Sequence, residues 1–475
     1  MFKSRVLKHG FAATMWLIGS ISLEGVHAQE PPAGGANTEV GELRKEVEEL
    51  RQLVLQLKGD IAELKAEKSA PARAQSSADK PPEPAAAPSV AAAASAKAGA
   101  DFLRGLSINA LLDTYYEYNF NDPIGRVNLL RAYDVSSNSF SLNQADVLLE
   151  SAPDVSSGKR FGMRLDLQYG QATQTLQGSS ANELRPEIYR NVFQAYGSYW
   201  IPIHGSWLAL DFGKWASSLG IEGNYTKDQV NYSRALWFDF LPFYHSGLRA
   251  DYKVNDQLSF NYWLVNGTQQ SEAFNNFKDE LFGFVITPLP SITWTFNYYL
   301  GQEHPDVVFI SNPGPAQQGL PNQQGTAFEP IANSPNGRLH IVDSYVSWQP
   351  TAALMLAAEG DYVTEQLYGS SPYQRVTGGA LYTRYQLTPV FALSARGEYL
   401  ADVAGLFSGT RQYLKEGTFT AQYKVADGFI VYGEWRRDFS NVPYFLTEAL
   451  FVLASHQDTL GLGLTWWIGQ KEGPW

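Results

Sequence analysis

The chain between residues 248 and 267 alternates apolar and polar side chains along two arms, which Asn255 and Asp256 join. The apolar positions of the two arms are Leu248, Ala250, Tyr252, Leu258, Phe260, Tyr262 and Leu264. Because successive side chains of a strand point to opposite faces, this period of two predicts a β-hairpin with one apolar face and one polar face. A soluble β-sandwich shows the same alternation, so the arrangement of the other segments must decide the fold class.

Segments of the same alternating character follow one another from Asp101 almost to the C-terminus, and there are about sixteen of them. We expect strands near residues 106–119, 139–151, 160–169, 190–201, 207–215, 246–253, 258–266, 281–287, 291–300, 338–348, 353–363, 375–387, 390–400, 413–425, 428–438 and 456–468. Seven short and eight long connections alternate between them, which places every short turn and both ends of the strand region at one end.

This sorting of loops is typical of an even-stranded outer-membrane barrel with periplasmic turns and extracellular loops. A sandwich has no reason to sort its loops, and a propeller would repeat about every 40 to 50 residues. Backbone groups in lipid must be satisfied internally, so a sheet placed there has to close on itself. We therefore predict an all-β fold, a transmembrane antiparallel β-barrel of about 16 strands over residues 101–475.

The N-terminus has the pattern of a secretory signal peptide, residues 1–28. Basic residues precede an apolar stretch from Phe11 to Leu23, and a small-residue cleavage site, Val26-His27-Ala28, follows it. A membrane anchor is the alternative, but the apolar stretch is short and a glycine and a serine interrupt it. Residues 29–38 form a short segment after the cleavage site.

Residues 39–68 follow a period of seven in place of two. The apolar a and d positions are Val40, Leu43, Val47, Leu50, Val54, Leu57, Ile61 and Leu64. Together with bases at the e positions and mostly acids at g, they predict a short parallel coiled coil about 40 Å long. The Ala- and Pro-rich residues 69–100 follow as a linker, which is either a spacer or a disordered tract with no particular role.

Charged residues fall on the inner face of the predicted barrel, while rings such as Phe161 and Phe419 fall on the lipid face. The predicted pore-lining residues are Arg164, Asp166, Arg249, Asp251, Glu359, Asp361, Arg396, Glu398, Glu434 and Arg436. A lumen with this much charge is expected to hold water. The alternative is that the charges form pairs that stiffen the wall.

Composition and motifs narrow the function further. The net charge of −12, about −14 without the leader, makes nucleic acid an improbable partner. There are no cysteines, the 7 His are scattered, and no HExxH, GxSxG, Walker or EF-hand pattern occurs. His245 and Ser246 are adjacent and would face opposite sides of a strand. We predict no catalytic residue, metal site or cofactor, although an enzyme whose catalytic groups lie on separate strands would escape this search.

Three segments resemble the OmpL-like β-barrel porin family, also known as β-barrel porin-2. They are NALLDTYYEYNFNDP, SFSLNQADVLLE and GIEGNYTKDQVNYSRALWFDFLPFYHSGLRADY, and the last contains Gly220, Asn231, Ser233, Arg234, Pro242 and Gly247. The resemblance implies passive diffusion of small hydrophilic solutes through the outer membrane of a Gram-negative-type bacterium. The added coiled coil and linker depart from the family, and so does Trp475, where barrel assembly signals commonly end in Phe.

Three functions stay open: a diffusion porin, an outer-membrane enzyme or adhesin platform with the coiled coil as a periplasmic or cell-wall tether, and a soluble secreted β protein. For the porin, the expected partners are outer-membrane lipid and small hydrophilic solutes or ions. The coiled coil could reach peptidoglycan or a periplasmic protein. We expect a homo-oligomer, and we favour a trimer although the a and d residues alone suggest a dimer, because three adjacent barrels would concentrate their rods.

We expect the pore constriction in the long segment 216–245, between the fifth and sixth strands. Its charged residues are Glu222, Lys227, Asp228, Arg234 and Asp239, which would face inward charges such as Arg249 and Asp251. A wall with both signs of charge excludes neither ion strongly, so weak ion selectivity is expected.

Overall fold

The structure, a computed structural model, describes residues 105–176, 183–311, 326–471 and 473–475. The predicted signal peptide (1–28), short segment (29–38), coiled coil (39–68) and linker (69–100) lie outside the described residues. Within the described ranges, no helix combines the length and the apolar character needed to cross a membrane.

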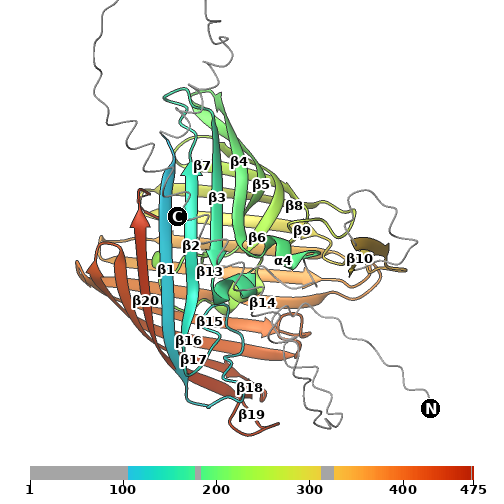
Figure 1. Ribbon diagram of the computed structural model, residues 1–475, viewed down its shortest axis with the longest axis vertical. Helices are drawn as coiled ribbons and strands as arrows, with labels where there is room; N and C mark the ends of the chain where they lie inside the picture. Colours follow the sequence, from blue (N-terminus) through green and yellow to red (C-terminus); the bar gives the residue numbers. More distant parts are fainter. Residues whose placement is uncertain (1–104, 177–182, 312–325, 472) are drawn as a thin grey trace, which may run out of the picture. The chain divides into compact units, whose positions relative to one another are not determined.

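Sixteen strands form one closed antiparallel barrel, in which β20 returns to pair with β1 (Figure 1). In order around the barrel they are β1 (Ser107–Asn119), β2 (Ser139–Ser151), β3 (Phe161–Tyr169), β4 (Val192–Ile203), β5 (Ser206–Ala216), β6 (Tyr244–Lys253), β7 (Leu258–Val265), β8 (Asp279–Leu289), β9 (Ile292–Gly301), β12 (Leu339–Trp348), β13 (Leu354–Glu365), β14 (Gln374–Thr388), β15 (Phe391–Asp402), β16 (Gln412–Ala426), β17 (Phe429–Ser440) and β20 (His456–Gly469). The predicted fold class and strand number are confirmed.

The strand register explains which side chains face lipid. Along β15 and β17 the exposed or half-buried positions alternate with buried ones, as a period of two requires. Apolar side chains such as Phe419 and Leu460 lie on the outside and are 53% and 54% exposed. Stacked rings, for example Trp200 on Trp207, lie next to a short turn, where aromatic residues of membrane barrels meet the lipid interface.

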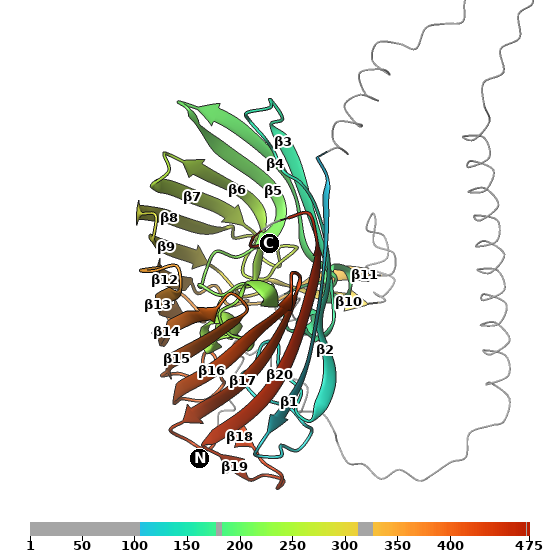
Figure 2. The same cartoon turned by 90° about the vertical axis from the view of Figure 1, so that its left-hand side faces the viewer.

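The short turns and the long connections were predicted with their positions, but the small elements inside the long connections were not. These are α3 (Gln171–Leu176), α4 (Pro186–Tyr189), η1 (Thr226–Asp228), α5 (Leu236–Phe240), the hairpin of β10 (Val307–Ser311) with β11 (Thr326–Pro330), and the hairpin of β18 (Phe445–Leu446) with β19 (Leu453–Ala454). Figure 2 shows β18 and β19 at the end of the barrel toward which β1 runs. Elements of two to six residues are too short to have a recognisable period.

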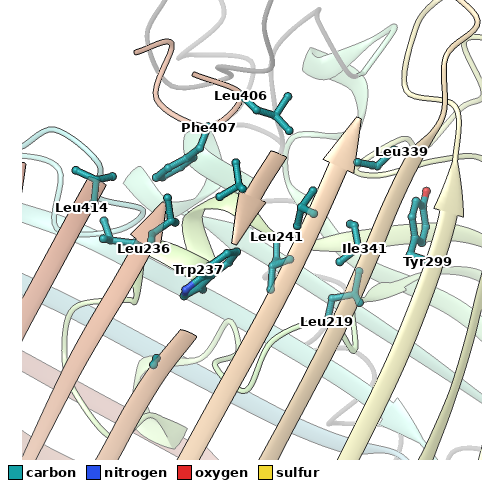
Figure 3. Packing of buried hydrophobic residues seen from close by; sticks show 14 of the residues in the cluster. Leu219, Leu236, Trp237, Leu241, Tyr299, Leu339, Ile341, Leu406, Phe407 and Leu414 are labelled. Atoms are coloured by element: carbon teal, nitrogen blue, oxygen red, sulfur yellow. The ribbon is translucent and has the colours of Figure 1, made fainter. Parts of the chain in front are cut away.

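The connection between β5 and β6 folds into the barrel. We call residues 217–243 the inward segment. Its apolar side chains Leu219, Leu236, Trp237 and Leu241 belong to one buried cluster with residues of the wall, among them Tyr299, Leu339, Ile341 and Leu414 (Figure 3). Burying these side chains against the wall removes apolar surface from water, which stabilises the segment inside the lumen.

Candidate functional site

Carboxylates of the barrel wall hold the backbone of the inward segment. Glu434 of β17 accepts the N–H groups of Tyr232 and Ser233 over 2.7 and 2.9 Å. Glu398 of β15 accepts the N–H of Leu236 over 3.0 Å, at the start of α5. Buried N–H groups without a partner are costly, and a charged acceptor gives them a strong one. The wall carboxylates therefore take the place of water as hydrogen-bond acceptors for the backbone of the segment, and in this way they fix its path.

The inward segment is also bonded to strands beyond the seam between β20 and β1. Gln144 of β2 accepts the N–H of Thr226 over 3.2 Å, and Asp166 of β3 accepts a hydrogen bond from the hydroxyl of Tyr225. Burial raises the pKa of the Tyr225 hydroxyl, so this residue remains a donor. The inward segment thus bonds to strands on both sides of the seam between the first and last strands.

A buried arginine joins the wall and the segment through ion pairs. Arg396 of β15 donates to Glu222 over 2.7 Å and to the carbonyl of Ser233 over 2.8 Å. It also lies 3.2 Å from Glu416 and 3.4 Å from Glu398. The guanidinium has five N–H donors in a fixed plane, which lets one side chain bond several acceptors at once.

A second cluster surrounds Arg131, in the connection between β1 and β2. Arg131 is buried and pairs with Asp438 over 2.8 Å, with Glu117 over 3.4 Å and with Asp134. Asp438 in turn pairs with Arg436 over 2.8 Å. The two buried arginines are therefore neutralised by acids from several strands and one loop.

The seam between the first and last strands is also tied to the inward segment. Asp113 of β1 accepts hydrogen bonds from Thr226 over 2.7 Å, from Tyr232 over 3.1 Å, from Thr465 of β20 over 3.1 Å and from Asn143 of β2 over 2.6 Å. One buried carboxylate thus connects both strands of the seam to the segment that crosses the lumen.

Most of the predicted pore-lining residues are ion-paired. The paired ones are Arg164 with Asp166, Arg249 with Asp211 and Asp251, Arg396 with Glu398, and Arg436 with Asp438. The other three, Glu359, Asp361 and Glu434, have no ion pair among the described residues, and Glu359 and Glu434 accept N–H groups of the inward segment. For the paired residues, the alternative of charges that stiffen the wall describes the geometry well.

The residues predicted for the constriction take different positions. Arg234 is buried and donates to the carbonyls of Gly223, Tyr232 and Asn224, with its guanidinium 4.6 Å from the ring centroid of Tyr133. It therefore holds the turns of the segment itself. Arg249, which was expected to face the constriction residues, has Asp211 as its partner over 2.7 Å.

Lys227 and Asp228 contact the C-terminal residues. Lys227 pairs with Asp228 over 2.7 Å and lies 4.6 Å from the ring centroid of Trp475, and burial lowers its pKa. The N–H of Trp475 donates to Asp228 over 3.0 Å. The last strand keeps its register up to Gly469 opposite Asn109, so Trp475 follows the strand and packs on the inward segment.

Asp239 in α5 has one buried carboxylate oxygen without a hydrogen bond within the described residues. Burial raises the pKa of this carboxyl to about 7; the charge of Arg436 opposes the rise, and that of Asp134 adds to it. The side chain therefore titrates near neutral pH.

Several residues of this site were not predicted from the sequence. Asp343 and Glu416 lie in predicted strands, in the same alternation as the inward residues named above, so the pattern could have found them. Arg131 and Asp134 lie in an irregular connection, where no period marks the residues that turn inward.

Comparison with known proteins agrees with this architecture. The sequence profile of the family described as "Putative beta-barrel porin-2, OmpL-like" matches residues 105–465. No curated protein matches the chain. The chain is similar to a loop-deletion mutant of the outer membrane protein OmpT of Vibrio cholerae, with 11% identity, a TM-score of 0.48, and coverage of 76% of this chain and 99% of that one.

Two further solved structures are similar at the same level. One is the outer membrane channel DcaP of Acinetobacter baumannii, with 8% identity, a TM-score of 0.47, and coverage of 76% of this chain and 97% of that one. The other is an anion-selective porin from Comamonas acidovorans, with 8% identity, a TM-score of 0.46, and coverage of 76% and 99%.

Proposed function

Because the chain belongs to the OmpL-like β-barrel porin family, whose members are outer-membrane channels, we infer that it lets small hydrophilic solutes or ions diffuse passively across the outer membrane. The family and the closed 16-stranded barrel make it an outer-membrane porin. The family is one of channels, and we propose no catalytic role for the barrel.

One observation carries the proposal: a polar segment is held inside a closed barrel by the side chains of its wall. The inward segment bonds to Glu434 and Glu398 on one side of the seam between β20 and β1, and to Gln144 on the other side of that seam. We propose that it forms the constriction of the pore, with Glu222, Lys227, Asp228, Arg234 and Asp239 in or next to it. A segment fixed at this many points sets a constant pore width.

The charge distribution supports weak ion selectivity. Both signs of charge occur together in the wall: Arg396 pairs with Glu222, Glu398 and Glu416, and Arg249 pairs with Asp211 and Asp251. At physiological salt the Debye length is about 8 Å, so an ion passing a constriction senses the sum of the nearby charges. A wall that carries both signs of charge excludes neither ion strongly, although acids outnumber arginines in both clusters.

We propose further features from the sequence pattern alone. Residues 1–28 would be removed as a signal peptide, and residues 39–68 would form a parallel coiled coil in the periplasm, joined to the barrel by the linker 69–100. The rod would contact peptidoglycan or a periplasmic protein. Three chains would assemble side by side in the lipid of the outer membrane.

Conductance in a planar lipid bilayer tests the channel. Mature protein, refolded and shown to run faster on SDS gels unboiled than boiled, should give stepwise current increases that scale with salt concentration. Folded protein that inserts and conducts no current would overturn the channel proposal and favour a platform function.

A further inference from the structure

Three buried carboxylates meet on the inner face of β12 and β13. Asp343 and Asp361 are direct neighbours across the two strands, and Glu359 lies two residues before Asp361 on the same face. One oxygen of each lies within 4.8 Å of those of the other two. The three residues are 0%, 4% and 7% exposed in the order Asp343, Asp361, Glu359, so bulk water does not screen their charges.

No cation within the part of the chain that the structure describes compensates these charges. Among the described residues, no lysine, arginine or histidine forms an ion pair with any of the three. This differs from the nearby acids, since Glu398 and Glu416 pair with Arg396, and Asp438 pairs with Arg131 and Arg436. An uncompensated buried charge is costly, so three ionised carboxylates at this place need a ligand that supplies positive charge, whereas protonated ones would share protons.

Two of the three carboxylates accept hydrogen bonds from protein donors, and the third does not. Glu359 accepts the N–H of Ile221 over 3.1 Å and the hydroxyl of Tyr382 over 2.9 Å, and Asp343 accepts the side-chain amide of Asn297 over 2.8 Å. Asp361 is buried, and neither of its oxygens accepts a hydrogen bond from the described residues.

The position opposite Asp361 on β14 is Gly378, so no side chain at that position can donate to Asp361. A carboxylate that is buried, without a donor and directed at two others is what remains when the ligand of a site is not a protein group.

We propose that Asp343, Glu359 and Asp361 bind one divalent cation, and that it is a hard ion of the calcium type. Carboxylate oxygens are the ligands that such ions prefer, and the cluster has no His or Cys ligand of the kind that zinc sites use. Two Ca–O bonds of about 2.4 Å span the separations found here, whereas magnesium needs shorter bonds in a stricter geometry. Backbone carbonyls and water would complete the coordination.

The site would fix the beginning of the inward segment. Glu359 joins the cluster to Ile221, and the preceding Gly220 has a φ of +84° and lies against the Glu359 carboxylate, 3.2 Å from where a Cβ would be. An ion on Glu359 would hold this carboxylate in the orientation that accepts the Ile221 N–H. The inference does not require the barrel to conduct, because it concerns the anchoring of the segment.

Calcium binding to the full mature protein tests the site directly. Refolded protein would be stripped with EDTA, dialysed against radioactive calcium at about 0.15 M KCl to suppress weak surface binding, and compared with Asp361→Asn and Asp343→Asn. The wild type should bind one more calcium ion per chain than either variant, with at least a tenfold tighter dissociation constant at that site. Glu365→Gln is the matched control, because this buried acid lies on the same strand outside the cluster and should leave binding unchanged.

The melting temperature gives a second readout. It can be measured on the wild type alone, with and without calcium, if a variant does not fold. The wild type should melt higher in calcium than in EDTA, and Asp361→Asn should lose that difference. Equal calcium binding by wild type and the two Asp variants would overturn the proposal. A second result would also overturn it: the melting temperature of the wild type does not change with calcium, and Asp361→Asn melts higher than the wild type in EDTA. Asp343 and Asp361 would then share a proton in place of an ion.

Discussion

Arg396 of β15 donates to Glu222 of the inward segment over 2.7 Å, and the side chains of both residues are almost completely buried. This ion pair links the wall of the barrel to the segment that crosses its lumen. Its contribution to stability cannot be assigned to one contact, because the same guanidinium also lies against Glu398 and Glu416.

Replacement of this arginine should therefore be strongly destabilising. Arg396→Met leaves Glu222 and Glu398 without an ion pair and Glu416 with Arg436 alone. Breaking a buried pair in this way typically costs about 3–5 kcal/mol. Urea unfolding in lipid vesicles, followed by tryptophan fluorescence, measures the free energy of unfolding. Arg437→Met is the control, since Arg437 is half-exposed and pairs with Asp458 on the outer face, where a loss below about 1 kcal/mol is expected. Equal losses for the two variants would contradict the role given to Arg396.

Removing the charge of Arg249 should shift ion selectivity. Arg249→Gln leaves Asp211 and Asp251 uncompensated on the inner wall, so the ratio of potassium to chloride permeability should rise about twofold. The reversal potential across a bilayer with a salt gradient measures this ratio. Lys159→Gln lies in the turn between β2 and β3, away from the constriction, and should leave the potential nearly unchanged. A similar shift in both variants would place the constriction elsewhere.

The stability of the inward segment should fall as pH rises through neutrality. Folding raises the pKa of Asp239 from 3.8 to about 7, so the folded state favours the protonated carboxyl. The resulting stabilisation is complete below pH 3.8 and is lost as pH rises to about 7, with a slope of at most about 1.4 kcal/mol per pH unit. Melting temperatures between pH 5 and pH 8, at roughly constant ionic strength, should decline less in Asp239→Asn than in the wild type.

Asp154 provides the control for this pH dependence. Its hydrogen bonds with Ser156 and Ser157 in an exposed turn lower its pKa, so any stability it contributes is present above 3.8 and lost only in acid. Asp154→Asn should therefore leave the slope above pH 5 as it is in the wild type. If Asp239→Asn has the wild-type slope as well, then Asp239 does not titrate in this range.

Removal of the N-terminal rod should reduce the yield of trimers. We expect crosslinked trimers of the full mature chain, and we expect a truncated chain that begins at Asp101 to form them less completely. Crosslinking followed by SDS gels of unboiled samples compares the two. The same oligomer in equal yield from both chains would mean that the barrels alone determine assembly, and that the rod has another role.

The strands could be predicted from the sequence because lipid and water impose opposite requirements on the two faces of each strand. A period of two results, and Pro- and Gly-containing turns interrupt it. The position of the connection 216–245, between the fifth and sixth strands, also indicated an inward fold by analogy with porins. Its contacts could not be predicted, because they join residues far apart in sequence without a local signal. Arg234, for example, was expected to face the pore and bonds instead to the carbonyls of its own segment.

The hydrogen bonds of Asp113 have a consequence for the order of folding. Its partners Thr226 and Thr465 lie 113 and 352 residues away along the chain, so this arrangement has a very high contact order. The last strand supplies Thr465, and therefore the carboxylate cannot acquire all its partners until that strand has joined the barrel. A barrel closed without the inward segment would bury Asp113 at the seam with fewer donors, whereas a segment already docked presents Thr226 and Tyr232 to it. The segment that crosses the lumen therefore supplies two of the four donors on which the carboxylate depends where the first and last strands meet.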